Sequence, residues 1–290
     1  MIKTSLLASP QPGLVDAMPP RVAGAASARL PAMAWLLALA AALWPHWIWA
    51  FRRLADGSDD PLGLVALVVL CCLIVRLAPD LRRTLSPRWC AFAAIATIAA
   101  TFAQLSAAPA LFGLMCAAIA FSAALCAFLP HRVPKLPLIG LALLALPLIA
   151  SLQFYAGYPL RLATTEISRW LLVAAGETVA RSGTALWLAG RLVIVDAPCS
   201  GVQMVWMAYF CACTQAGWSG LRDRLFLRRL AGVGAIVLAG NVLRNSVLVL
   251  LEARSAPVSE ALHEGAGLLV LAGVCAAVLR LVRGGGDASR

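Results

Sequence analysis

The chain has 290 residues, of which 62% are hydrophobic and only 13% are charged. A soluble domain carries roughly twice that charged fraction, so the composition excludes an ordinary soluble enzyme. The formal net charge of +11 would suit a nucleic-acid partner, but the basic residues stand between long apolar runs. Because the positive-inside rule explains that placement better, we expect contact with the lipid bilayer and no nucleic acid.

Eight apolar runs follow an N-terminal tail at residues 1–30, which is rich in Ala and Pro and which we expect to be disordered and cytoplasmic. Runs of this kind are typical of transmembrane helices, and the period-two alternation of a membrane β-barrel is missing. The sequence therefore predicts an all-α polytopic membrane protein with about eight transmembrane helices. The runs lie at about 31–51, 62–78, 91–107, 110–129, 136–155, 200–218, 230–251 and 263–281.

The basic residues also predict the topology. With the N-terminus in the cytoplasm, the short loops alternate between rich and poor in Arg and Lys, as the positive-inside rule requires. The densest cluster, LRDRLFLRR at 221–229, precedes the seventh run. We expect an N-terminal bundle of five spans over 31–155, a core of three spans over 199–283, and a cytoplasmic tail at 284–290.

The longest loop, residues 156–198, is expected on the outer side. Apolar residues recur at helical spacing from Leu160 to Val179 with charges between them, which predicts a helix lying on the membrane surface. The stretch TALWLAGRLVIVDAP then has two short apolar runs around Gly190, which predicts a short extracytoplasmic β-hairpin. This hairpin would deliver Cys199 to the outer mouth of the sixth span.

The seventh run contains residues that are costly in hydrocarbon. Asn241, Arg244 and Asn245 fall at i, i+3 and i+4 and so share one helix face. An arginine there costs at least ~2.5 kcal/mol on insertion scales and usually faces a polar site. The alternative is an arginine that snorkels to the outer headgroups, but such an arginine needs no asparagines beside it. Arg76, alone near the inner end of its run, is expected only to snorkel.

Topology brings three reactive groups to the outer face of the last three spans. These are the Cys199 thiol, the Arg244 guanidinium and the imidazole of His263, although a lone histidine in a loop is more often unremarkable than catalytic. A thiolate attacks a carbonyl, an imidazole transfers the proton, and a guanidinium stabilises the oxyanion. Together they form a sufficient set for acyl transfer.

The other cysteines give no sign of a metal site. Most of them lie inside apolar runs, where cysteine behaves as a small hydrophobic residue. The chain has no CxxC pair and no His/Cys cluster with zinc spacing, and such spacing is what predicts a zinc site. We expect no metal and no cofactor.

Three segments resemble the exosortase/archaeosortase family of membrane transpeptidases. They are DAPCSGVQ, GNVLRNSVLVLLE and LHEGAGLLVLAG, in that order, and together they cover roughly residues 183–273. The resemblance implies that Cys199 is the nucleophile, Arg244 the essential arginine and His263 the acid/base histidine. Ser200, Gly201 and Asn241 belong to the same motifs, and Asn245 shares the helix face of Asn241 as a supporting residue.

The resemblance also implies a substrate and a location. Members of this family are expected in the bacterial inner membrane with the active site facing the periplasm. They act on exported proteins that end in a Pro-Glu-Pro-like motif, a transmembrane helix and a basic end (a PEP-CTERM-like sorting signal), and they often accompany exopolysaccharide synthesis. The acceptor that receives the cleaved protein is unknown.

Two other functions remain open from the residues alone. One is a transporter or channel in which Arg244 and its asparagines line a substrate path, and the other is a non-catalytic scaffold for polysaccharide assembly. Nothing resembles the inverted repeats or paired broken helices common in transporters. Only the transpeptidase requires the Cys199 thiol, so that thiol separates the three hypotheses.

Overall fold

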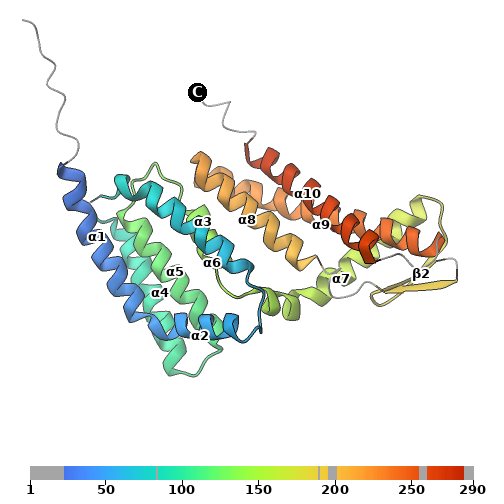
Figure 1. Ribbon diagram of the computed structural model, residues 1–290, viewed down its shortest axis with the longest axis horizontal. Coiled ribbons are helices and arrows are strands. Elements are labelled where there is room, and N and C mark those ends of the chain that lie inside the picture. Colours follow the sequence, from blue (N-terminus) through green and yellow to red (C-terminus); the bar gives the residue numbers. More distant parts are fainter. Residues whose placement is uncertain (1–22, 83, 189, 195–200, 255–259, 284–290) are drawn as a thin grey trace, which may run out of the picture.

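The computed structural model describes residues 23–82, 84–188, 190–194, 201–254 and 260–283. The predicted all-α architecture is confirmed, since helices dominate and a small sheet precedes the last three of them (Figure 1). The helices are α1 Ala23–Ala42, α2 Trp44–Ala55, α3 Leu62–Leu77, the 3₁₀ turn η1 Ala78–Asp80, α4 Pro87–Leu105, α5 Ala110–Phe128, α6 Leu136–Leu144, α7 Ile149–Ala174, α8 Val202–Ser219, α9 Asp223–Arg254 and α10 Glu260–Arg283.

In the described part of the chain, five helices are long and apolar enough to cross a membrane, or up to seven if each of two bent helix pairs is one span. The five are α3 with η1, α4, α5, α9 and α10, and the bent pairs are α1 with α2 and α6 with α7. The predicted count of eight is therefore not reached. The missing span is α8, whose 18 residues include the polar Gln203, Thr214 and Gln215 among apolar ones.

The first bent pair turns by 68° at Leu43, between α1 and α2. Pro45 lies in the first turn of α2, a position that proline favours because its missing N–H is not needed there. The Trp47 Nε1–H donates to the Ala40 carbonyl across the bend at 2.9 Å. Helix α1 begins at Ala23, before the predicted start of the first span at residue 31, and residues 1–22 of the predicted tail lie outside the described residues.

The second bent pair corrects the fifth predicted span. A helix over 136–155 is wrong, because α6 ends at Leu144 and α7 sets off at 97° to it from Ile149. Pro147 lies in the break, where it cannot donate a helical hydrogen bond. Helix α3 packs closely here, since a Cβ on Gly63 would lie 2.7 Å from the Ala145 carbonyl oxygen. Helix α7 then runs along the lower edge of the molecule toward the sheet (Figure 1).

Helix α7 confirms the helical part of the predicted surface helix but is amphipathic in an unusual sense. The middle of its buried side is polar, whereas large apolar residues are exposed along its other side. The exposed set fits a lipid-facing helix with aromatic residues at the membrane interface. The buried polar residues are Thr164, Thr165 and Ser168, and the exposed aromatic residues are Phe154, Tyr155, Tyr158 and Trp170.

The predicted hairpin is present and has a third strand. Strands β1 Val179–Ser182, β2 Ala185–Leu188 and β3 Arg191–Ile194 form an antiparallel sheet in the order β1-β2-β3. Val179, predicted as helical, belongs to β1. Gly183 and Gly190 have φ of 61° and 78° in the two tight turns, a conformation that glycine adopts without strain.

The sheet packs against α7 and the C-terminal part of α9. Leu186, Leu188 and Val193 form a buried cluster with Leu172 of α7 and Val249 of α9. Glu166 of α7 also forms an ion pair with Arg181 of β1, with 2.8 Å between the carboxylate oxygen and Arg181 Nε. The end of β3 at Ile194 therefore lies beside α9, and residues 195–200 separate it from Gly201 at the N-terminal end of α8.

The loops predicted as cytoplasmic meet at one end of the helices. Arg132 pairs with Asp80, and the Asp223 carboxylate accepts hydrogen bonds from the backbone N–H groups of Lys135 and Leu136. Arg76 does more than snorkel, because it donates to the Trp218 carbonyl at 2.8 Å and lies over that indole ring.

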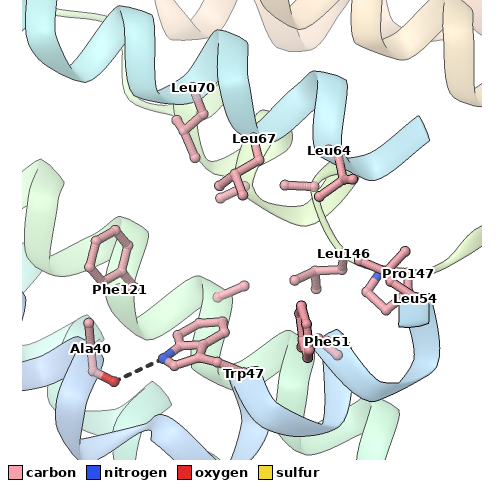
Figure 2. Close-up of a pocket in the computed structure, with 14 residues that line it drawn as sticks. Ala40, Trp47, Phe51, Leu54, Leu64, Leu67, Leu70, Phe121, Leu146 and Pro147 are labelled. Atoms are coloured by element: carbon pink, nitrogen blue, oxygen red, sulfur yellow. Dashed lines mark hydrogen bonds between the residues drawn. The ribbon is translucent and has the colours of Figure 1, made fainter. Parts of the chain in front are cut away.

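An apolar cavity of 420 Å³ lies between α2, α3, α5 and the α6–α7 break (Figure 2). The polar atom drawn into this region, Trp47 Nε1, already donates to Ala40. The cavity offers no reactive group, so the chemistry of the protein has to be sought elsewhere. Its lining includes Trp47, Phe51, Leu64, Leu67, Phe121 and Leu146.

Candidate functional site

The structure describes some of the predicted site residues and not others. Cys199 and Ser200 lie outside the described residues. His263 falls within helix α10, but its side chain is also outside the description. Gly201 and the α9 residues Asn241, Arg244 and Asn245 are described, and the geometry of the site follows from them.

The three polar residues of α9 face the interior of the protein. Asn241 and Asn245 are buried, and Arg244 between them is half-buried. The Asn245 Nδ2–H donates to the Asn241 carbonyl at 2.9 Å, and the Asn241 Nδ2–H donates to Thr164 Oγ1 of α7 at 3.0 Å. The polar face of α9 is therefore turned toward the polar face of α7.

Arg244 lies against helix α10. A Cβ on Gly267 would lie 3.0 Å from Arg244 Nη2 and 3.2 Å from both its Cζ and Nε. The guanidinium therefore occupies the space that any larger residue at 267 would need. Its Nε is buried and has no hydrogen-bond partner among the residues that the structure describes. A buried N–H of this kind requires an explanation, and a ligand oxygen would provide one.

Gly267 also relates Arg244 to His263. Residue 263 precedes Gly267 by four residues within α10, and residues four apart share one face of a helix. The backbone of residue 263 is thus one turn closer to the N-terminal end of α10, on the side of this helix that meets Arg244.

Gly201 brings the start of α8 to the same place. It has φ of 80° at the N-terminal end of the helix, and a Cβ there would lie 2.8 Å from both Cγ and Nδ2 of Asn241. Cys199 is two residues earlier in the chain.

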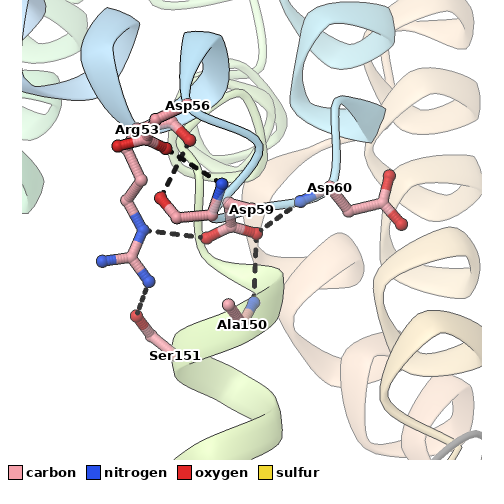
Figure 3. Close-up of polar contacts among 7 residues, drawn as sticks. Arg53, Asp56, Asp59, Asp60, Ala150 and Ser151 are labelled. Carbon is pink, nitrogen blue, oxygen red and sulfur yellow. Dashed lines mark hydrogen bonds and ion pairs between the residues drawn. The ribbon is translucent and has the colours of Figure 1, made fainter.

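A second polar network lies where α2 ends and α3 begins (Figure 3). The buried Asp59 carboxylate pairs with Arg53 Nε at 3.2 Å and accepts from the Ala150 N–H, in the first turn of α7, at 3.0 Å. Its neighbour Asp60 accepts from Gln203, in the first turn of α8, at 3.2 Å. The loop between α2 and α3 therefore touches the starts of both helices that lead to the site.

Sequence reasoning missed two parts of this arrangement. Thr164 and Ser168 are four residues apart, which is a helical spacing, and both reach α9, since Ser168 donates to the Val242 carbonyl at 3.4 Å. The spacing was visible in the sequence. Gly267 was visible too, within LHEGAG, but no sequence pattern shows that an arginine rests on it. Among the described residues, no group of three His, Cys, Asp or Glu could hold a metal ion.

Comparison with known proteins adds one finding to this geometry. The family model described as "Transmembrane exosortase (Exosortase_EpsH)" matches residues 53–280. No curated protein and no solved structure matches the chain. The matched range includes the network around Asp59, the sheet, and all of the polar residues on α9.

Proposed function

The chain belongs to the transmembrane exosortase family, and we propose that it is a membrane-embedded cysteine peptidase or transpeptidase. In this proposal Cys199 is the nucleophile, His263 the general acid and base, and Arg244 the residue that stabilises negative charge. Ser200, Gly201, Asn241 and Asn245 support them.

One observation carries the proposal: the polar face of α9 that holds Asn241 and Arg244 contacts both the start of α8 and helix α10. The Arg244 guanidinium rests on Gly267 of α10, one turn after His263. On its own helix this arginine stands three residues after Asn241, against which Gly201 packs two residues after Cys199. An arginine that snorkels to the lipid boundary would not need to rest on a glycine of the neighbouring helix.

The chemistry follows from the roles of these groups. The Cys199 thiol gives its proton to the His263 imidazole, and the sulfur attacks the carbonyl carbon of the scissile peptide bond. The oxygen of the resulting tetrahedral intermediate becomes negative, and the Arg244 guanidinium, with its buried Nε, donates hydrogen bonds to it. The C–N bond then breaks, and His263 returns the proton to the departing amine, which carries the C-terminal tail away.

The remaining thioester is resolved by a second nucleophile. Water or the amine or hydroxyl group of an acceptor attacks the thioester carbonyl, His263 accepts its proton, and the sulfur leaves as the Cys199 thiolate. Water gives hydrolysis and an acceptor gives transpeptidation. Both outcomes use the same residues, so the acceptor alone decides between them.

The proposed substrate is an exported protein with a PEP-CTERM-like tail. Sorting systems of this kind often accompany exopolysaccharide synthesis. The protein would lie in the bacterial inner membrane with its site toward the periplasm, because this orientation puts the basic cluster at 221–229 in the cytoplasm. The basic end of the substrate tail would stay inside by the same rule. Helix α7 and the sheet, next to the start of α8, would shape the pocket for the sorting motif.

The test is the processing of a tailed reporter protein in membranes that contain wild type, Cys199→Ser or Cys199→Ala. Immunoblots confirm that each variant accumulates in the membrane. We expect both variants to leave the precursor uncut. Normal processing by Cys199→Ala would refute the nucleophile, and the transporter and scaffold hypotheses would then take its place.

A further inference from the structure

A buried hydrogen bond joins the helix before the sheet to the helix that carries the arginine. The Asn241 Nδ2–H donates to Thr164 Oγ1 at 3.0 Å, and neither residue is more than 2% exposed. Thr164 belongs to α7 and Asn241 to α9, so this bond spans 77 positions of the sequence. It sets the orientation of the Asn241 side chain, because a buried amide turns away from a partner only if it finds another.

The same amide is also in contact with the start of α8. At Gly201 a Cβ would approach the Asn241 Cγ and Nδ2 to 2.8 Å, closer than side chains normally pack. Gly201 also has φ of 80°, a conformation that glycine adopts without strain. The start of α8 therefore packs directly against the Asn241 amide, which is hydrogen-bonded to Thr164.

The described residues on either side of the segment with Cys199 both contact α9. On one side, β3 ends at Ile194 after packing Val193 against a cluster that contains Val249 of α9. On the other side, Gly201 rests on Asn241 of the same helix. Only residues 195–200 lie between these two contacts, so a shift of Gly201 would be transmitted to residue 199 within two peptide units.

We infer that Thr164 is a positioning residue for the proposed reaction: it holds the Asn241 amide on which Gly201 rests, and thereby sets where Cys199 stands relative to Arg244. This inference rests on the proposed function, but its geometry stands independently of the reaction. Thr164 touches no reacting atom. Its loss would lower the turnover of bound substrate rather than the binding of substrate, because misplacement of a reacting group by about 1 Å costs up to 10²-fold in rate.

The chain offers a matched control at the next position. Thr165 is as buried as Thr164, but its Oγ1 donates to the Arg161 carbonyl of its own helix at 2.7 Å. Thr165→Val therefore removes a buried hydroxyl from the same turn of α7 without touching the bond to α9. Any general effect of valine on the folding of α7 should appear in both variants.

The experiment compares wild type, Thr164→Val, Thr164→Ser and Thr165→Val, all reconstituted as full chains in proteoliposomes with a tailed reporter substrate. We expect Thr164→Val to lower kcat by about 10- to 100-fold with KM nearly unchanged. Thr164→Ser, which keeps the hydroxyl, should restore most of the rate, and Thr165→Val should stay near wild type. Equal kcat in Thr164→Val and Thr165→Val would overturn the inference, as would a loss confined to KM.

A second readout separates this inference from the proposed function. The rate at which a charged maleimide alkylates Cys199 is followed by mass spectrometry of the native protein, without any substrate. Thr164→Val should change this rate severalfold and Thr165→Val should not, even if Cys199→Ala were to show that the thiol is not catalytic. Identical alkylation rates in the two variants would show that Thr164 does not position Cys199.

Discussion

The Arg244 guanidinium rests directly on Gly267, with Nη2 only 3.0 Å from where a Cβ at residue 267 would lie. Helix α9 carries the charged side chain, and the absence of a side chain at Gly267 of α10 leaves room for it. An intramembrane arginine held in this way has its position set by a neighbouring helix, which differs from one that is free to reach the headgroups.

Gly267→Ala should lower processing of the reporter by about tenfold or more, because the added methyl group displaces the guanidinium. The same change should not destabilise α10 through its backbone, since alanine favours a helix over glycine by about 1 kcal/mol. Activity measured in proteoliposomes and thermal stability measured in detergent would separate the two effects.

The matched control for this change is Gly273→Ala. Gly273 lies in the same helix, and a Cβ there would meet nothing within 4 Å. We expect wild-type processing from it. Equal activity of the two alanine variants would show that the contact between Gly267 and Arg244 has no part in catalysis.

Gly201→Ala should be more damaging than the same change at the other end of α8. Gly201 and Gly220 both have positive φ, at 80° and 69°, so alanine costs about 1–2 kcal/mol of backbone strain at either position. At Gly201 the methyl group must also displace Asn241, whereas at Gly220 it meets nothing within 4 Å. We expect Gly220→Ala to keep most of its activity.

The comparison is made on both variants by reporter processing and by melting in detergent. Gly201→Ala should lose processing even when its melting temperature matches that of Gly220→Ala. If the two variants keep equal activity, the contact between Gly201 and Asn241 does not matter for the site.

Arg244→Lys should lose most of the activity although it keeps the charge. Lysine has no Nε–H in the buried position and no planar fork, and its ammonium is a strongly hydrated point charge. Removing one donor of an oxyanion site costs roughly 10²–10³ in kcat, and we expect a loss of that order.

Arg76→Lys provides the comparison for an arginine that also stands in an apolar span. Arg76 binds the Trp218 carbonyl and indole ring at the opposite end of α8, so its replacement should change stability slightly and leave processing intact. Processing by Arg244→Lys at the wild-type rate would contradict the role of the guanidinium.

Much of the membrane fold could be predicted because apolar runs and basic loops report directly on helices and on their ends. The predicted runs 62–78 and 110–129 correspond closely to α3 and α5. The run 136–155 was wrongly predicted as one straight span because it is apolar throughout. Hydropathy does not show where a helix ends and the chain turns. Only Pro147 marked the break that turns α7 away from α6.

The polar face of α7 escaped prediction for a different reason. The apolar residues of α7 predicted a helix on the membrane surface, whose other face would meet water. In the structure Thr164, Thr165 and Ser168 are buried against other helices while Trp170 is exposed. Which face of an amphipathic helix is buried in a membrane protein depends on its neighbours, and sequence periodicity shows only that two faces exist.

The network around Asp59 leads to the last prediction. Asp59 is buried with its side chain fully covered, and it accepts hydrogen bonds from Arg53, from Ala150 at the start of α7, and from the Asp60 N–H. Asp59→Ala removes the acceptor from all three and leaves the Arg53 charge, which is 26% exposed, without this partner. We expect a loss of about 1–3 kcal/mol in the free energy of unfolding.

Asp56→Ala in the same loop is its control. Asp56 is exposed, and hydrogen bonds from Ser58 hold the pKa of its carboxyl below the ordinary value, but it does not bind α7. Its replacement should leave the melting temperature unchanged, whereas Asp59→Ala should lower it by several degrees. Because Asp59 fixes the first turn of α7, and α7 carries Thr164, processing should fall together with stability in Asp59→Ala. A wild-type melting temperature for Asp59→Ala would show that the loop between α2 and α3 does not hold α7 in place.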